Sequence, residues 1–98
     1  MSGHPLDEVE IQSALAQLPG WQVLDGKFHK DYKFANFTEA MGWMVCVAIE
    51  AEKLGHHPIW QNIYDSVSVD LLTYDLGHVI SNLDAELAQI MEKLYRRA

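Results

Sequence analysis

The feature that most constrains this chain is one long, predominantly apolar segment between residues 37 and 54. Apolar side chains recur through it at steps of three and four residues, which is the spacing of one face of an α-helix. The residues of that face are Phe37, Met41, Met44, Ala48, Ala51 and Leu54. The additional apolar residues Trp43, Val45, Val47 and Ile49 widen the face beyond a normal stripe. The segment therefore predicts a helix that is covered on more than one side.

Two further segments have the pattern of helices. The first spans residues 6–18, has acidic residues in its first turn and stops at Pro19-Gly20. The last opens on Ser81 and Asp84, whose spacing is that of a capping box, and continues with apolar residues at helical spacing. Its end carries Lys93, Arg96 and Arg97, which suit the negative end of a helix dipole.

Two turn signals between the helices predict β-hairpins. Asp25-Gly26 accepts the positive φ angles of a type I′ turn between residues 21–24 and 27–34. Asp65-Ser66 separates residues 59–64 from 67–73, where apolar and polar side chains alternate. The order α-β-β-α-β-β-α therefore predicts an α+β fold of two layers, a four-stranded antiparallel sheet with three helices on one face. Residues 1–98 are enough for a single domain.

Composition excludes several classes of protein. The chain has 7 Lys and Arg against 14 Asp and Glu, a net charge of −7, so it is not a general nucleic-acid binder. It has no apolar stretch long enough to span a membrane, and residues 1–10 lack the pattern of a signal peptide. The single Cys46, flanked by valines, is expected to pack inside its helix rather than act as a nucleophile. We therefore expect a cytoplasmic location.

A polar cluster lies where the long helix must end. Gly55 is a natural helix stop, and Pro58 favours an extended backbone at the residue before it. His56 and His57 are therefore held on a stiffened connection. Because imidazole titrates near neutrality, such a pair can donate and accept protons. A solvated capping loop would show the same two histidines, although the neighbouring Glu52, Trp60 and Tyr64 favour a functional site.

A zinc site is an open alternative for this cluster. It would combine His56 or His57 with His78 and a carboxylate, because zinc prefers three or four such ligands. Adjacent histidines on an extended chain point apart, which makes it difficult for both to bind one ion. We therefore expect no metal.

The segment 51–60, AEKLGHHPIW, resembles the pterin-4a-carbinolamine dehydratase family, and the resemblance extends over nearly the whole chain. Further matching positions are Asn62, Tyr64, Val67, Val69, Leu71, Thr73 and Asp84. The resemblance implies dehydration of a 4a-hydroxytetrahydropterin to the quinonoid dihydropterin, in tetrahydrobiopterin recycling, with no metal or other cofactor. It also implies assembly as a homodimer or homotetramer.

The resemblance implies a role for each residue of the cluster. His56 would be the general acid, His57 would bind and orient the pterin, and Glu52 would support the two histidines. The expected catalytic residues are His56, His57, Glu52 and Tyr74. The expected substrate-binding residues are Gly55, His56, His57, Trp60, Leu72, Thr73, Tyr74 and Asp75.

Tyr74 stands where the family carries a third histidine. A tyrosine hydroxyl, with an ordinary pKa near ~10 against ~6.5 for histidine, is a much weaker acid at neutral pH. Tyr74 could orient the substrate while His56 carries a slower, epimer-selective reaction, or His78 could fill the gap. Alternatively, the protein binds a pterin without turnover, or acts as an interaction module that promotes the dimerisation of a protein partner.

Overall fold

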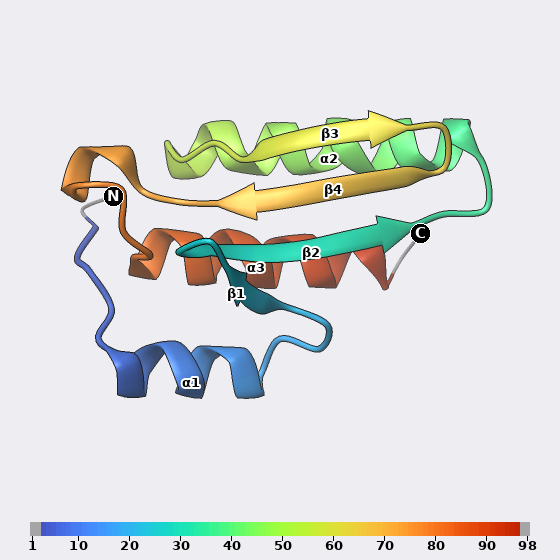
Figure 1. Cartoon of the computed structure of the whole chain (residues 1–98). Coiled ribbons are helices and arrows are strands. Elements are labelled where there is room, and N and C mark those ends of the chain that lie inside the picture. Colours follow the sequence, from blue (N-terminus) through green and yellow to red (C-terminus); the bar gives the residue numbers. More distant parts are fainter. Residues whose placement is uncertain (1–2, 97–98) are drawn as a thin grey trace.

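The structure is a computed structural model that describes residues 3–96, so Arg97 of the expected basic helix end lies outside the described part. Its elements are α1 (Glu8–Ala16), β1 (Gln22–Leu24), β2 (Lys27–Lys33), α2 (Phe37–Leu54), β3 (Ile59–Ile63), β4 (Ser66–Leu71), the 3-10 turn η1 (Tyr74–Leu76) and α3 (Asn82–Tyr95). The four strands form one antiparallel sheet with the helices on one side (Figure 1), which confirms the expected α+β fold.

The sheet has the strand order β1-β2-β4-β3, so each hairpin contributes one central and one edge strand. The first turn is as expected, because Asp25 and Gly26 have φ angles of 52° and 76°. The second turn lies at Tyr64 and Asp65, one residue before the expected position. There the side-chain amide of Asn62 donates to the carbonyl oxygens of Tyr64 and Ser66, at 3.1 and 3.0 Å, and this holds the earlier turn.

Helix α1 is shorter than the expected 6–18. Asp7 caps it, with its side chain accepting from the backbone N–H of Glu10. Leu6 is excluded because its N–H donates to the carbonyl of Ile80, 3.0 Å away, in a strand-like contact. After Ala16, the N–H groups of Gln17 and Leu18 donate three residues back, which ends the α-helix in tighter turns.

The buried face of α2 differs from the expected one. It consists of Ala40, Trp43, Val47, Ala51 and Leu54, whereas Phe37 and Ala48 are exposed. Trp43 sets this rotation, because its ring packs 4.5 Å from the ring of Tyr32 and its Nε1 donates to the carbonyl of Met91 at 3.2 Å. The outer face is uncovered in the single chain, so Cys46 is exposed, and its expected packing inside the helix is wrong.

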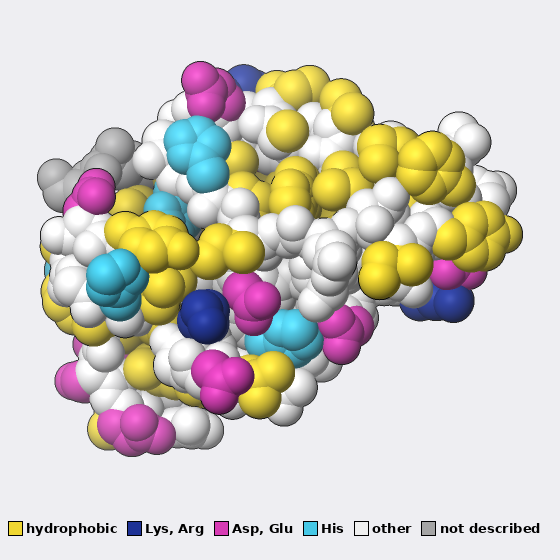
Figure 2. Space-filling model, turned by 45° about the horizontal axis from the view of Figure 1, so that its top comes forward, with side chains coloured by type: hydrophobic (Ala, Val, Ile, Leu, Met, Phe, Trp, Pro, Cys, Tyr) yellow, Lys and Arg dark blue, Asp and Glu magenta, His cyan; other side chains and the backbone are white. Residues whose placement is uncertain are grey.

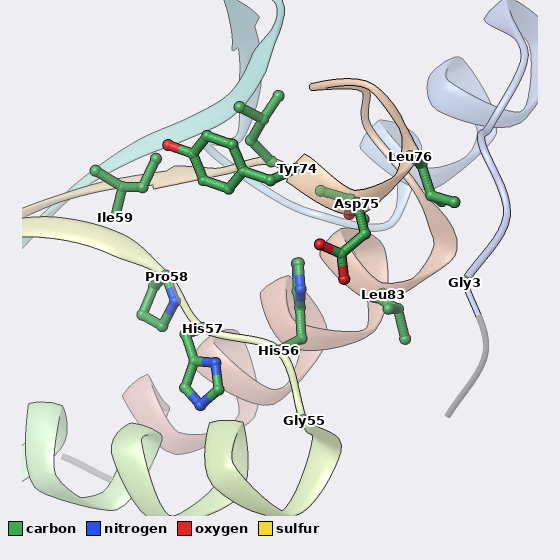
Figure 3. A pocket seen from close by; sticks show the side chains of 12 residues that line it. Gly3, Gly55, His56, His57, Pro58, Ile59, Tyr74, Asp75, Leu76 and Leu83 are labelled. Atoms are coloured by element: carbon green, nitrogen blue, oxygen red, sulfur yellow. The ribbon is translucent and has the colours of Figure 1, made fainter.

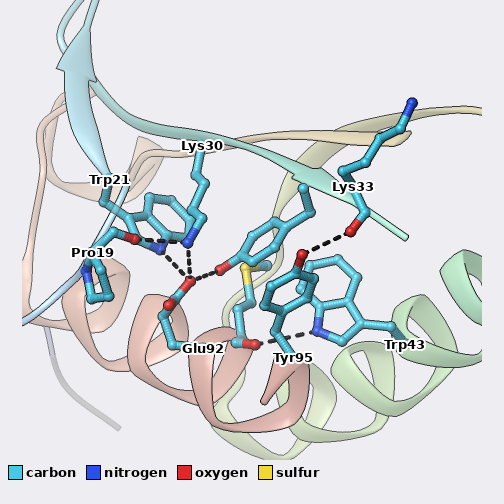
Figure 4. Close-up of polar contacts among 9 residues, drawn as sticks. Pro19, Trp21, Lys30, Lys33, Trp43, Glu92 and Tyr95 are labelled. Atoms are coloured by element: carbon cyan, nitrogen blue, oxygen red, sulfur yellow. Dashed lines mark hydrogen bonds and ion pairs between the residues drawn. The ribbon is translucent and has the colours of Figure 1, made fainter. Parts of the chain in front are cut away.

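A buried carboxylate joins the sheet to α3 (Figure 4). Oε2 of Glu92 accepts from Nζ of Lys30 at 2.7 Å, from Nε1 of Trp21 at 3.2 Å and from the hydroxyl of Tyr32. Burial and the hydrogen bond to Glu92 raise the pKa of Tyr32 well above its usual range. These contacts fix the helix layer against β2 and leave the opposite end of the sheet to form the site.

On the outer face of the sheet, His29 lies between two carboxylates. Its Nδ1 is 2.9 Å from Oδ1 of Asp70, and its Nε2 is 3.3 Å from Oδ2 of Asp31. Burial lowers the pKa of His29, but the hydrogen bonds to Asp70 and Asp31 outweigh burial and raise it above 6.5. The folded protein therefore holds this proton more tightly than the unfolded chain does.

This linkage predicts a pH-dependent stability. The contribution of His29 is fully present below about pH 6.5 and is lost as the pH rises through the higher pKa of the folded state. Urea unfolding of the wild type and of His29→Gln at a series of pH values should show the free-energy difference between them shrinking as the pH rises. Parallel curves would contradict the assignment.

Candidate functional site

A pocket of about 400 Å³ opens at the end of the sheet where α2 leads into β3 and β4 leads into α3 (Figure 3). Its walls come from four parts of the chain: Gly3, residues 55–59, residues 72–76 and Leu83. The expected residues Gly55, His56, His57, Leu72, Thr73, Tyr74 and Asp75 all line it. The fold therefore brings most of the predicted substrate-binding residues to one cavity.

The end of α2 determines where the two histidines point. Gly55 has a φ of 73°, a left-handed conformation that glycine adopts without a steric penalty. The N–H groups of Gly55 and His56 both donate to the carbonyl of Ala51, at 2.9 and 3.2 Å, which closes the helix. The chain then reverses, so the side chain of His56 is buried and that of His57 is exposed.

His56 is held by a carboxylate that has no exposed surface. Nε2 of His56 lies 2.5 Å from Oδ1 of Asp84, which is 0% exposed. Oδ2 of Asp84 accepts from the hydroxyl of Thr73 and from the N–H of Ser81, each at 2.8 Å. Because an ionised carboxylate only accepts hydrogen bonds, Nε2 of His56 carries the proton in this contact. Nδ1 is then the ring nitrogen that remains for a ligand.

The same carboxylate also begins a helix. The expected capping box is present, since Asp84 accepts from the N–H of Ser81 and the Ser81 hydroxyl accepts from the N–H of Leu83. The hydroxyls of Ser81 and Thr73 lie 2.7 Å apart and complete a buried polar network. The sequence indicated Asp84 as a helix cap and a family position, but not as the partner of His56.

His57 has a separate partner. Its Nε2 is 2.9 Å from Oε1 of Glu52, and both side chains are largely exposed. Glu52 thus contacts His57 and leaves His56 to Asp84. The two adjacent histidines are held by different carboxylates in different surroundings.

The far wall of the pocket is the turn η1. Its Tyr74 is exposed and packs its ring edge-on against that of His78, with centroids 4.8 Å apart. His78 has a φ of 59° and does not line the pocket. Tyr74 therefore occupies the wall, and His78 lies behind it.

Trp60 lies outside the cavity. Successive strand residues point to opposite faces, so Ile59 lines the pocket whereas Trp60 packs towards the helices, 6.2 Å from the ring of Trp43. Tyr64 is exposed at the β3–β4 turn. Neither side chain lines the pocket.

The zinc alternative finds no geometric support. Within residues 3–96, no three His, Cys, Asp or Glu side chains gather into a group that could hold a metal ion. His78, the third ligand of that alternative, lies against Tyr74 instead.

Among the described helices, none is both long and apolar enough to cross a membrane.

Comparison with known proteins identifies a family and several relatives. The family model described as pterin 4 alpha carbinolamine dehydratase matches residues 4–94. The chain belongs to this family. Pterin-4-alpha-carbinolamine dehydratases are lyases that remove water, so the expected family and enzyme class are confirmed.

Individual relatives support the same assignment. A protein of Solibacter usitatus, assigned by name to the pterin-4-alpha-carbinolamine dehydratases, is 45% identical over 91% of this chain and 93% of its own length. A protein of Jannaschia with the same assignment is 47% identical over 91% of this chain and 94% of its own length. A crystal structure from Brucella melitensis, called a transcriptional coactivator/pterin dehydratase, is 38% identical with a TM-score of 0.88 and covers 94% of this chain and 99% of its own.

Asp84→Asn should destabilise the protein because an amide cannot accept all the hydrogen bonds that the carboxylate receives. The free energy of unfolding in urea should fall by about 1–3 kcal/mol. Ser81→Ala is the matched control, since it removes the side-chain cap, at a cost of about 1 kcal/mol, and leaves His56 on Asp84. An Asp84→Asn protein as stable as the wild type would contradict the network.

Proposed function

We propose that this protein dehydrates a 4a-hydroxytetrahydropterin to the quinonoid dihydropterin, as a step in tetrahydrobiopterin recycling, with His56 as the proton donor. The observation that carries the proposal is the buried pair of His56 and Asp84, which leaves Nδ1 of His56 for a ligand in the pocket. Family membership supplies the reaction class.

The chemistry requires an acid at the leaving hydroxyl, because hydroxide is a poor leaving group. His56 in its charged form carries a proton on Nδ1 that can pass to this oxygen, so that water leaves instead. Asp84 fixes the ring orientation and stabilises the positive charge before transfer, as a buried carboxylate does for a catalytic histidine. Burial of the pair limits competition from solvent.

The pocket also suits a flat heterocycle. Its volume of about 400 Å³ falls in the usual range for small-molecule sites. Tyr74 extends across it towards Ile59 (Figure 3), where its ring can cover one face of a ligand. His57, held by Glu52 at the mouth, can orient the bound pterin. In this proposal Tyr74 orients the substrate, while His56 supplies the acid.

A second function is favoured by the surface of α2. Val45 and Ile49 are 58% and 54% exposed, and Cys46 lies between them on the same uncovered side (Figure 2 shows how apolar side chains gather on one face of the molecule). The Brucella structure bears the name of a coactivator as well as a dehydratase. We therefore also propose that α2 carries the contact surface of a homodimer or homotetramer, or binds a protein partner. We further propose a cytoplasmic location.

A dehydration assay on 4a-hydroxytetrahydropterin tests the main proposal. The wild type should exceed the uncatalysed rate, and His56→Gln should lower kcat by about 10²–10³-fold because the general acid is gone. His29→Gln, an equivalent substitution on the outer face of the sheet, should retain kcat when it is measured above neutral pH, where His29 no longer contributes to stability. Tyr74→His should raise kcat by adding a second acid to the pocket.

Two results would contradict this account. A wild-type rate equal to background that is recovered in Tyr74→His would indicate a degenerate site and favour the interaction module. An active wild type with an equally active His56→Gln would show that the acid has been assigned to the wrong residue.

A further inference from the structure

The turn that carries Asp75 is held firmly at its base. Thr73 and Val79 pair across it, with the N–H of each donating to the carbonyl of the other at 2.9 and 3.3 Å. Inside it, the N–H of Gly77 donates to the carbonyl of Tyr74 at 3.0 Å, and Gly77 has a φ of 92°. These contacts fix the backbone of Asp75 as part of the pocket wall.

Asp75 has an unusual position among the acidic residues near the site. It is the one carboxylate among the described residues that line the pocket. Within residues 3–96, Asp75 has no hydrogen bond or ion pair, whereas Asp84 is occupied by His56 and Glu52 by His57. Figure 3 shows the carboxylate of Asp75 pointing into the cavity on the side of the His56 ring. The free acceptor and the histidine thus face one space from different walls.

The dehydration needs a proton acceptor as well as an acid. When the hydroxyl leaves C4a, the product acquires a double bond between C4a and the adjacent ring nitrogen. That nitrogen must lose its proton, and a base positioned to receive it speeds the step. His57 is engaged by Glu52 at the exposed mouth, and the hydroxyl of Tyr74 points away from His56 in Figure 3. Asp75 is the pocket group left to accept the proton.

We propose that Asp75 is the proton acceptor of this dehydratase, acting with His56 as donor; the inference rests on the proposed function. The bond between C4a and oxygen breaks as the oxygen takes the Nδ1 proton of His56. The ring N–H bond breaks as its proton passes to Asp75, and its electron pair forms the new bond to C4a. After water leaves, Asp75 releases a proton and His56 regains one through solvent. No oxidant or reductant takes part.

The test compares Asp75→Asn with the wild type in the full-length chain. An amide of the same size cannot accept the proton, so kcat should fall by about 10²–10³-fold. Affinity for 7,8-dihydropterin, followed by its fluorescence, should change less than about threefold, since the shape of the pocket is kept. Asp75→Glu should restore part of kcat.

Asp25→Asn is the matched control. It removes the same charge at an exposed turn outside the pocket, and its φ of 52° is one that asparagine tolerates. Both variants should match the wild type in thermal stability, because neither aspartate side chain has a hydrogen-bond partner in the described structure. The control should also match it in kcat.

The outcomes separate the two claims. An active wild type with an Asp75→Asn variant of equal kcat would overturn the role of Asp75 and leave the proposed function standing. A raised KM and weaker dihydropterin binding at unchanged kcat would overturn it too, since Asp75 would then recognise the substrate without receiving a proton. A wild type with no activity would overturn the proposed function and this inference with it.

Discussion

The site depends on one buried carboxylate. Asp84 has no exposed surface and receives hydrogen bonds from three separate parts of the chain: the residue after the α2 cap, the segment that follows β4 and the start of α3. A buried carboxylate is costly unless it is paired and hydrogen-bonded, so these contacts must form together. The hydrogen-bonded carboxylate that stabilises the start of α3 therefore also places His56 at the pocket.

The remainder of the fold fixes the positions of the three segments that contact Asp84. At the far end of the helix layer, Glu92 joins α3 to β2 through Lys30 and Tyr32. Between them, Trp43 packs on Tyr32 and donates to the carbonyl of Met91, which holds α2 against α3. With both helices fixed on the sheet, the end of α2 and the start of α3 meet where β4 ends. The acid of the proposed reaction is thus positioned by packing far from the pocket.

Features that depend on neighbouring residues, such as the end of α2, could be predicted from the sequence. Contacts between distant segments could not. Gly55 and Pro58 indicated where α2 ends, because glycine and proline act on their own backbone. The face of α2 was wrongly assigned, since Trp43 is fixed by rings on β2 and a wide apolar stripe does not indicate which side contacts them. The pairing of β2 with β4 and the contact between His56 and Asp84, 28 residues apart, join segments with no local signal. Trp60 was expected in the pocket and lies outside it, because a family motif does not indicate towards which face of a strand a side chain points.

The central claim is that Asp84 holds Nε2 of His56 so that Nδ1 serves the ligand. The most direct test is ¹⁵N NMR of the His56 ring in the free protein and with bound 7,8-dihydropterin. The account predicts a protonated Nε2 in both states, with its signal unchanged, and an Nδ1 signal that shifts when the pterin binds. A protonated Nδ1 beside a bare Nε2, or a ligand-induced shift confined to Nε2, would contradict it.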